Sequence, residues 1–149
     1  MTITRAQAET ELVRRAKKKM LLINMAVTVD GTNEDLSGPL AFAARSVGLT
    51  LASPITVTTA ELAGVGDDLL DEFLDRAHLR LLNDIKGNLT LVDTTSGPFK
   101  ESFGQLQDNL EKEIKRLEEK ISVSYDGSGT LEAGVVSLDF QTKRDDALP

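Results

Sequence analysis

Residues 98–122, PFKESFGQLQDNLEKEIKRLEEKIS, decide the fold of this chain. Apolar side chains recur there at spacings of 4, 3, 4, 4, 3 and 4 residues, which keeps one face of an α-helix apolar. The stripe consists of Phe99, Phe103, Leu106, Leu110, Ile114, Leu117 and Ile121. Pro98 suits the first position of a helix. We therefore predict a long helix, and its apolar run favours an ordinary core helix over a separate coiled coil.

A second long helix is predicted over residues 67–89. Asp67 and Asp68 would lie in its first turn, where carboxylates interact favourably with the helix dipole. Its apolar positions form a broad face, as in a central core helix: Leu69, Leu70, Phe73, Leu74, Ala77, Leu81, Leu82 and Ile85. We expect Gly87 and Asn88 to fray its end.

Two shorter helices are predicted before it. The first covers residues 4–25, with Thr4 as N-cap and Gln7 as its capping-box partner, and we expect it to be separable from the rest of the chain. The second covers residues 39–47 and ends at Gly48. Residues 49–59 contain Pro54 and a β-branched run, which indicates an extended link between helices.

The spacing of apolar residues changes after Ile121. Residues 123–125 read as a strand, residues 126–129 as a turn, and the residues after them as a second strand in which Val136, Leu138 and Phe140 alternate with polar residues. An isolated hairpin is marginal in water. We therefore expect these three side chains to contact a partner by strand addition.

Together these elements predict a mainly α fold. It would be a small helical bundle of two long helices and shorter N-terminal helices, with an extended C-terminal β-hairpin tail. The expected domains are a basic N-terminal helix (residues 1–30), a helical core (36–122) and a β tail (123–149).

Composition argues against most enzyme classes. The 149 residues include no Cys and one His, which excludes disulfides, iron–sulfur clusters and a zinc site with several histidines in one chain. Phosphate-loop, nucleophile-elbow and zinc-protease motifs do not occur. His78 is expected at the boundary of the core, with no catalytic role. We predict no catalytic residue, no bound metal and no cofactor. No apolar run approaches the length of a membrane span, and a cleaved signal peptide is not favoured.

Charge is unevenly distributed along the chain. The net charge is −7, whereas residues 1–25 carry six bases and two acids, a net of +4. The predicted contact residues of this basic arm are Arg14, Arg15, Lys17, Lys18 and Lys19. We expect them to contact either a neighbouring subunit or DNA, and we favour the subunit because the rest of the chain is acidic.

An acidic face is predicted at the start of the second long helix. Its residues are Asp67, Asp68, Asp71, Glu72 and Asp75. Carboxylates can ligate a hard cation, but the spacing of a calcium loop does not occur here. We interpret them as a surface between subunits.

The helix order resembles a known family. A short helix ending at Gly48 and a Thr-rich connection are followed by DLLDEFLDRA (68–77), and TTSGPFKES (94–102) then opens the long helix. This order resembles that of the head-to-tail connector adaptors of tailed double-stranded-DNA bacteriophages. The basic N-terminal helix departs from the shorter family pattern.

The resemblance implies a structural virion protein located in the neck of the particle, and in the host cytoplasm during assembly. It implies a dodecameric ring of adaptor subunits bound to the portal protein, with a stopper or tail-completion protein on the other side. DNA would pass through the channel without sequence-specific binding. The alternative is a small regulatory module that binds nucleic acid through its basic helix.

Overall fold

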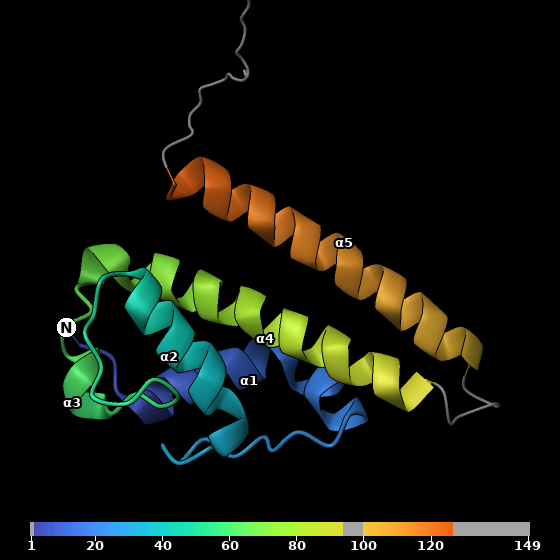
Figure 1. Ribbon diagram of the computed structural model, residues 1–149, viewed down its shortest axis with the longest axis horizontal. Helices are drawn as coiled ribbons and strands as arrows, with labels where there is room; N and C mark the ends of the chain where they lie inside the picture. Colours follow the sequence, from blue (N-terminus) through green and yellow to red (C-terminus); the bar gives the residue numbers. More distant parts are fainter. Residues whose placement is uncertain (1, 94–99, 127–149) are drawn as a thin grey trace, which may run out of the picture. The chain divides into compact units, whose positions relative to one another are not determined.

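The computed structural model describes residues 2–93 and 100–126, and every regular element in these ranges is a helix (Figure 1). The α-helices are α1 (Arg5–Leu22), α2 (Ser37–Ser46), α3 (Thr59–Leu62), α4 (Leu70–Asp93) and α5 (Lys100–Ser124). Short 3₁₀ turns at Glu34–Leu36 and Asp67–Leu69 lead into α2 and α4. The prediction of a mainly helical fold is confirmed for this part of the chain.

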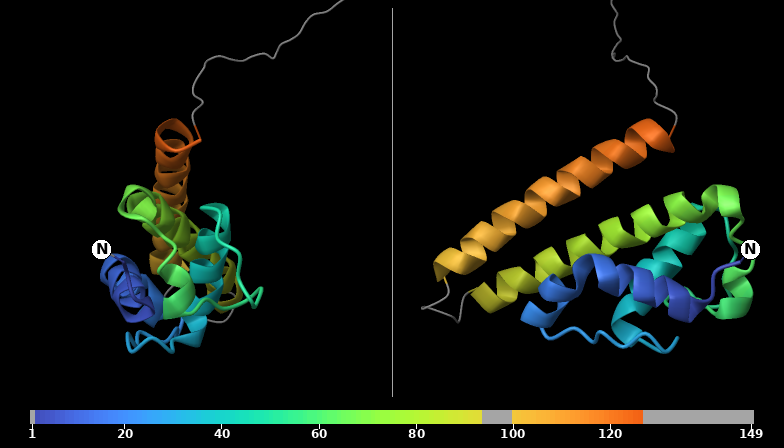
Figure 2. Two further views of the ribbon diagram at one scale, coloured as in Figure 1. Left: turned by 90° about the vertical axis from the view of Figure 1, so that its left-hand side faces the viewer. Right: turned by 180° about the vertical axis from the view of Figure 1, so that it is seen from behind.

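α4 is the central helix of its unit. α1 and α2 both pack against it, as Figure 1 and the view from behind in Figure 2 agree. Its predicted stripe is buried at Leu74, Ala77, Leu81 and Ile85, together with Phe73. The buried side chains of α2 are mainly small and include Ala41 and Ala44, and side chains of this size let neighbouring helix backbones approach closely.

α1 begins as predicted. The Thr4 side chain accepts from the backbone N–H of Gln7, and the Gln7 side chain accepts from the backbone N–H of Thr4, which completes the capping box. The expectation that this helix is separable is wrong. Leu12 and Met20 are fully buried, and chain contacts place Met1–Ile114 in one unit that joins α1 to the predicted core. The second unit begins at Lys115, inside α5.

A buried ion pair fixes the start of α1. Arg5 and Glu9 are 7% and 0% exposed, and the Arg5 Nε donates to Glu9 Oε2 at 3.0 Å. The two terminal nitrogens of Arg5 donate to Thr56 Oγ1, Val57 O, Asn33 O and Ser37 Oγ at 2.9, 3.0, 2.8 and 2.7 Å. All five guanidinium N–H groups therefore have an acceptor.

Glu9 completes the same cluster from the other side. Its Oε1 accepts from the Gly31 N–H at 2.7 Å and its Oε2 from the Asn33 N–H at 3.0 Å. Gly31 has a φ of +92°, a conformation that suits glycine, and the turn around it presents both amides to the carboxylate. The pair thus holds two loops that are distant in sequence against the first turns of α1.

α4 is longer than predicted. It continues through Gly87 and Asn88 to Asp93, so the expected fraying at these residues is wrong. Leu89 is almost fully buried, and its packing offsets the helix-breaking tendency of Gly87, which costs about 1 kcal/mol relative to Ala. The link before α4 also differs, because Thr58 and Glu61 form a capping box that starts the short helix α3. Gly48 does end its helix, with a φ of +99°.

The strand predicted at residues 123–125 is wrong. Val123 and Ser124 are the last residues of α5, and the Tyr125 N–H still donates to Ile121 O at 2.9 Å. Helix propagation from the preceding turns outweighs the weak strand preference of one β-branched residue. The rest of the predicted hairpin, with Val136, Leu138 and Phe140, lies outside the described residues.

Candidate functional site

The basic arm divides into an outer and an inner set. Arg14, Lys17 and Lys18 are exposed, as their position opposite the apolar stripe predicts. Arg14 donates to Glu11, and this hydrogen bond lowers the pKa of the Glu11 carboxyl. The exposed cations thus form a basic surface along α1.

The inner set is engaged within the chain. Arg15 Nη1 donates to Asp75 Oδ1 on α4 at 3.2 Å, and Lys19 Nζ lies 3.2 Å from Glu113 Oε1 on α5. Arg15 Nε also lies 3.6 Å from Glu11 Oε2. The charge pattern predicts that the basic arm and the acidic helix attract one another. Part of this attraction is satisfied within a single chain, because Arg15 pairs with Asp75.

The predicted acidic face divides in the same way. Asp67, Asp68 and Asp71 are exposed at the start of α4, whereas Asp75 is buried beside Arg15. Glu72 is half-buried and accepts from Arg76 Nε at 2.8 Å. The acidic surface therefore consists of Asp67, Asp68 and Asp71, and Asp75 belongs to the packing of α1 on α4.

His78 lies in the interior among the inner charges. Its Nε2 has no hydrogen-bond partner and lies 3.7 Å from Glu113 Oε2. Burial, together with the charges of Arg15 and Lys19, lowers the pKa of His78 to about 4 against the opposing effect of Glu113 and Asp75. With this pKa the buried imidazole is neutral at neutral pH.

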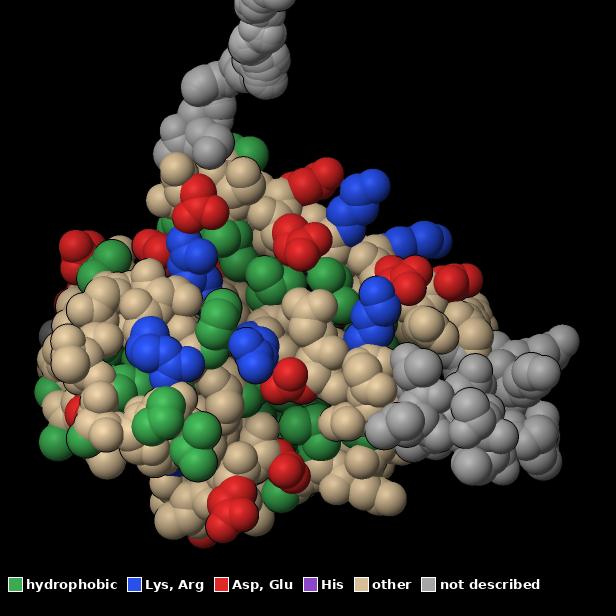
Figure 3. Space-filling model, in the orientation of Figure 1, with side chains coloured by type: hydrophobic (Ala, Val, Ile, Leu, Met, Phe, Trp, Pro, Cys, Tyr) green, Lys and Arg blue, Asp and Glu red, His purple; other side chains and the backbone are tan. Residues whose placement is uncertain are grey.

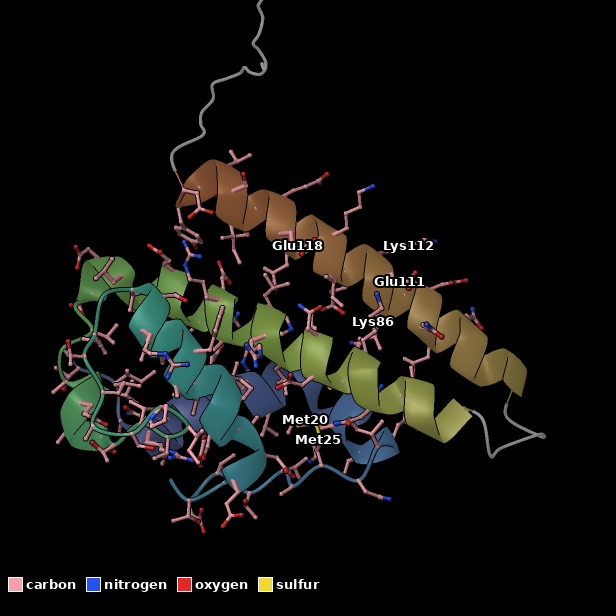
Figure 4. All side chains as sticks on the ribbon, in the orientation of Figure 1. Met20, Met25, Lys86, Glu111, Lys112 and Glu118 are labelled. Atoms are coloured by element: carbon pink, nitrogen blue, oxygen red, sulfur yellow. The ribbon has the colours of Figure 1, made fainter. Side chains whose placement is uncertain are left out.

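A second pair of side chains joins α4 to the middle of α5. Lys86 Nζ lies 3.3 Å from Glu111 Oε2, and the two side chains point toward one another (Figure 4). Both are substantially exposed, so this ion pair contributes little to stability.

An open pocket lies at the first turns of α1 and α4. Its volume is about 390 Å³, and its lining includes Ile3, Thr10, Glu11, Leu70 and Leu74. Leu70, which the sequence places in the core stripe, is only half-buried because it lines this pocket. The pocket therefore has apolar walls. In the sequence, its lining residue Leu70 is followed directly by Asp71 of the acidic surface.

Sequence reasoning missed the Arg5–Glu9 cluster. A signal for it exists, because Arg5 and Glu9 are four residues apart and share a helix face with Leu12 and Ala16. Opposite charges on an otherwise apolar face indicate a buried pair. Their partners at Asn33 and Thr56 carry no such signal.

Two classes of site find no support in the described part of the chain. Among residues 2–93 and 100–126, no three His, Asp or Glu side chains form a group that could hold a metal ion. No helix within the same ranges has the length and apolar character needed to cross a membrane. On the face drawn in Figure 3, basic, acidic and hydrophobic side chains are interspersed.

No protein-family model, curated protein or solved structure matches this chain.

Proposed function

We propose that this chain is a structural head–tail connector adaptor. Copies would form a ring beneath the portal of a tailed phage, dodecameric on the particle, around the channel through which DNA passes. The portal protein, neighbouring adaptor subunits and a stopper or tail-completion protein would be its partners. Its place would be the neck of the virion, and the host cytoplasm during assembly. It would have no catalytic role.

One observation carries this proposal: exposed charges of opposite sign lie on different helices of one unit. Arg14, Lys17 and Lys18 form the basic surface of α1, and Asp67, Asp68 and Asp71 form the acidic surface at the start of α4. A ring requires a heterologous contact, in which one surface of a subunit meets a different surface of the next. Two complementary surfaces on each copy supply that requirement.

The alternative function, nucleic-acid binding by the basic helix, is less well supported. Two of the five cations of the basic arm, Arg15 and Lys19, are engaged with Asp75 and Glu113 inside the chain. With a chain charge of −7, most of the surface repels phosphate.

A charge-swap experiment tests the proposal. The basic variant carries Arg14→Glu, Lys17→Glu and Lys18→Glu, and the acidic variant carries Asp67→Lys, Asp68→Lys and Asp71→Lys. Each is mixed with portal rings encoded by the same genome, and ring formation is followed by native mass spectrometry and electron microscopy. We expect the unmodified chain to form rings on the portal, each variant to lose them, and a chain with both sets of changes to regain them.

Circular dichroism confirms first that each variant is folded. Failure of the unmodified chain to bind the portal would overturn the proposal. So would duplex-DNA binding that weakens steeply with salt, with a slope near −0.9 per neutralised phosphate, and that the basic variant alone loses. That second outcome would favour the nucleic-acid function.

A further inference from the structure

Two adjacent leucines are exposed at the end of α1. Leu21 and Leu22 are 51% and 50% exposed, although the other large apolar residues of this helix are buried. Each comes four residues after a lysine, Lys17 before Leu21 and Lys18 before Leu22. Residues four apart lie on the same helix face, so α1 ends in an apolar projection bordered by cations.

The start of the same helix borders a feature of opposite character. The 390 Å³ pocket has apolar walls from Ile3, Leu70 and Leu74 and is open to solvent. In the sequence, the acidic surface adjoins a lining residue of this pocket, because Asp71 comes directly after Leu70. The recess therefore has apolar walls, and its lining includes the carboxylate of Glu11.

The projection cannot fill the pocket of its own chain. α1 has 18 residues, so its ends are roughly 27 Å apart at 1.5 Å per residue. Leucines at one end of a rigid helix do not reach a recess at the other end. If such a projection fills the pocket, it is therefore the projection of another molecule.

We propose that the occupant is the Leu21–Leu22 projection of a second copy of this chain. Lys17 and Lys18 of that copy would face Asp68 and Asp71 of the first, while the leucines pack on Ile3, Leu70 and Leu74. This contact joins two different ends of the molecule, so it repeats from copy to copy in a single direction. The inference rests on the proposed function and names the surfaces that build its ring.

A second copy fits better than an unrelated partner because both halves of the contact lie on this chain and match in two properties. The projection is apolar and basic, and the recess is apolar and acidic. Apolar anchors that enter a pocket, surrounded by complementary charges, are the usual centre of a specific protein interface.

Cross-linking tests the contact directly, because the native chain contains no Cys. Leu22→Cys labels the projection and Thr10→Cys labels the pocket, and both positions are exposed. A chain carrying both changes is assembled on portal rings and treated with a short bis-maleimide. We expect covalent chains longer than dimers on a denaturing gel, and no such ladder from either single variant.

The outcomes separate this inference from the proposed function. Rings on the portal without a ladder would overturn the contact and leave the adaptor function standing. A ladder in concentrated protein without portal binding would support the contact and remove the function. Cross-linking of Leu22→Cys to itself would reveal a symmetric contact and overturn the head-to-tail arrangement.

A second variant tests the apolar part without cysteines. Leu21→Ser with Leu22→Ser should abolish ring formation while leaving the thermal unfolding transition in place, because both side chains are exposed. Ile55→Ser is the matched control, since Ile55 is 71% exposed and lies outside both surfaces, and rings should persist. Rings that persist in the double serine variant would contradict the contact.

Discussion

Arg5 and Glu9 show how one pair of residues can decide the packing of a helix. Both are buried, and their bonds reach the loops at Asn33 and Thr56. The desolvation cost of burying two charges is offset only because every guanidinium N–H finds an acceptor. Removing one member leaves the other charged and buried.

The first prediction concerns this pair. Glu9→Gln should lower the free energy of unfolding by about 3–5 kcal/mol, because it leaves Arg5 without a counter-charge and places an amide N–H against backbone donors. Urea denaturation followed by circular dichroism measures the loss. Glu72→Gln is the control, since Glu72 also pairs with an arginine four residues away but near the surface, and its loss should stay below about 1 kcal/mol. Equal losses would contradict the assigned role.

The second prediction concerns His78, which makes the unfolding free energy depend on pH. Its pKa in the folded chain, about 4, lies below the ordinary value of 6.5, so the unfolded chain binds the proton first as pH falls. Its contribution to stability is fully present above pH 6.5 and is lost progressively toward pH 4. The charged groups that face His78 are Arg15, Lys19, Asp75 and Glu113.

Urea denaturation at pH 7 and pH 5 checks this prediction. The native chain should lose more stability between the two pH values than His78→Phe, which fills a similar volume without a titrating group. An identical loss in both proteins would show that His78 does not carry the effect.

At the scale of the element, α4 shows that a helix can continue through residues that usually end one. Gly87 is exposed and Leu89 is buried, so tertiary packing holds the last turns in place. The backbone entropy of Gly87 remains as a local weakness.

The third prediction concerns that weakness. Gly87→Ala should raise the free energy of unfolding by about 0.5–1 kcal/mol, because a Cβ there meets nothing within 4 Å and alanine restricts the unfolded chain. Gly48→Ala is the opposite case, since Gly48 has a φ of +99°, and it should destabilise. Thermal melts of the two variants measure whether each substitution raises or lowers stability. Destabilisation by Gly87→Ala would show that α4 is interrupted there.

At the scale of the whole molecule, the helical unit and the C-terminal residues are expected to have different tasks. Phe73, Leu81 and Leu12 are fully buried in the helical unit. Val136, Leu138 and Phe140 remain candidates for contact with the portal.

The fourth prediction separates these tasks. A chain ending at Asp126 should keep the helical circular dichroism signal and the melting temperature of the full chain, but lose affinity for portal rings. Sedimentation with portal rings measures the second quantity. Undiminished binding would exclude the tail as the docking segment, and loss of the melting transition would show that it supports the fold.

The sequence by itself determined the features that depend on near neighbours. The capping box of Thr4 and Gln7, the turn at Gly48 and the apolar stripes of α4 and α5 arise from spacings of three and four residues, because helix formation is a local process. The exposure of Arg14, Lys17 and Lys18 has its origin in the same periodicity.

Only the tertiary structure decided which charges meet and how far α4 extends. Arg15 finds Asp75 across 60 residues of chain, and Arg5 finds Asn33 and Val57 across 28 and 52. Such pairs depend on which surfaces the fold brings together, and local spacing does not encode that. The continuation of α4 past Gly87 has the same cause, because the packing of Leu89 outweighs the intrinsic preference of its neighbours.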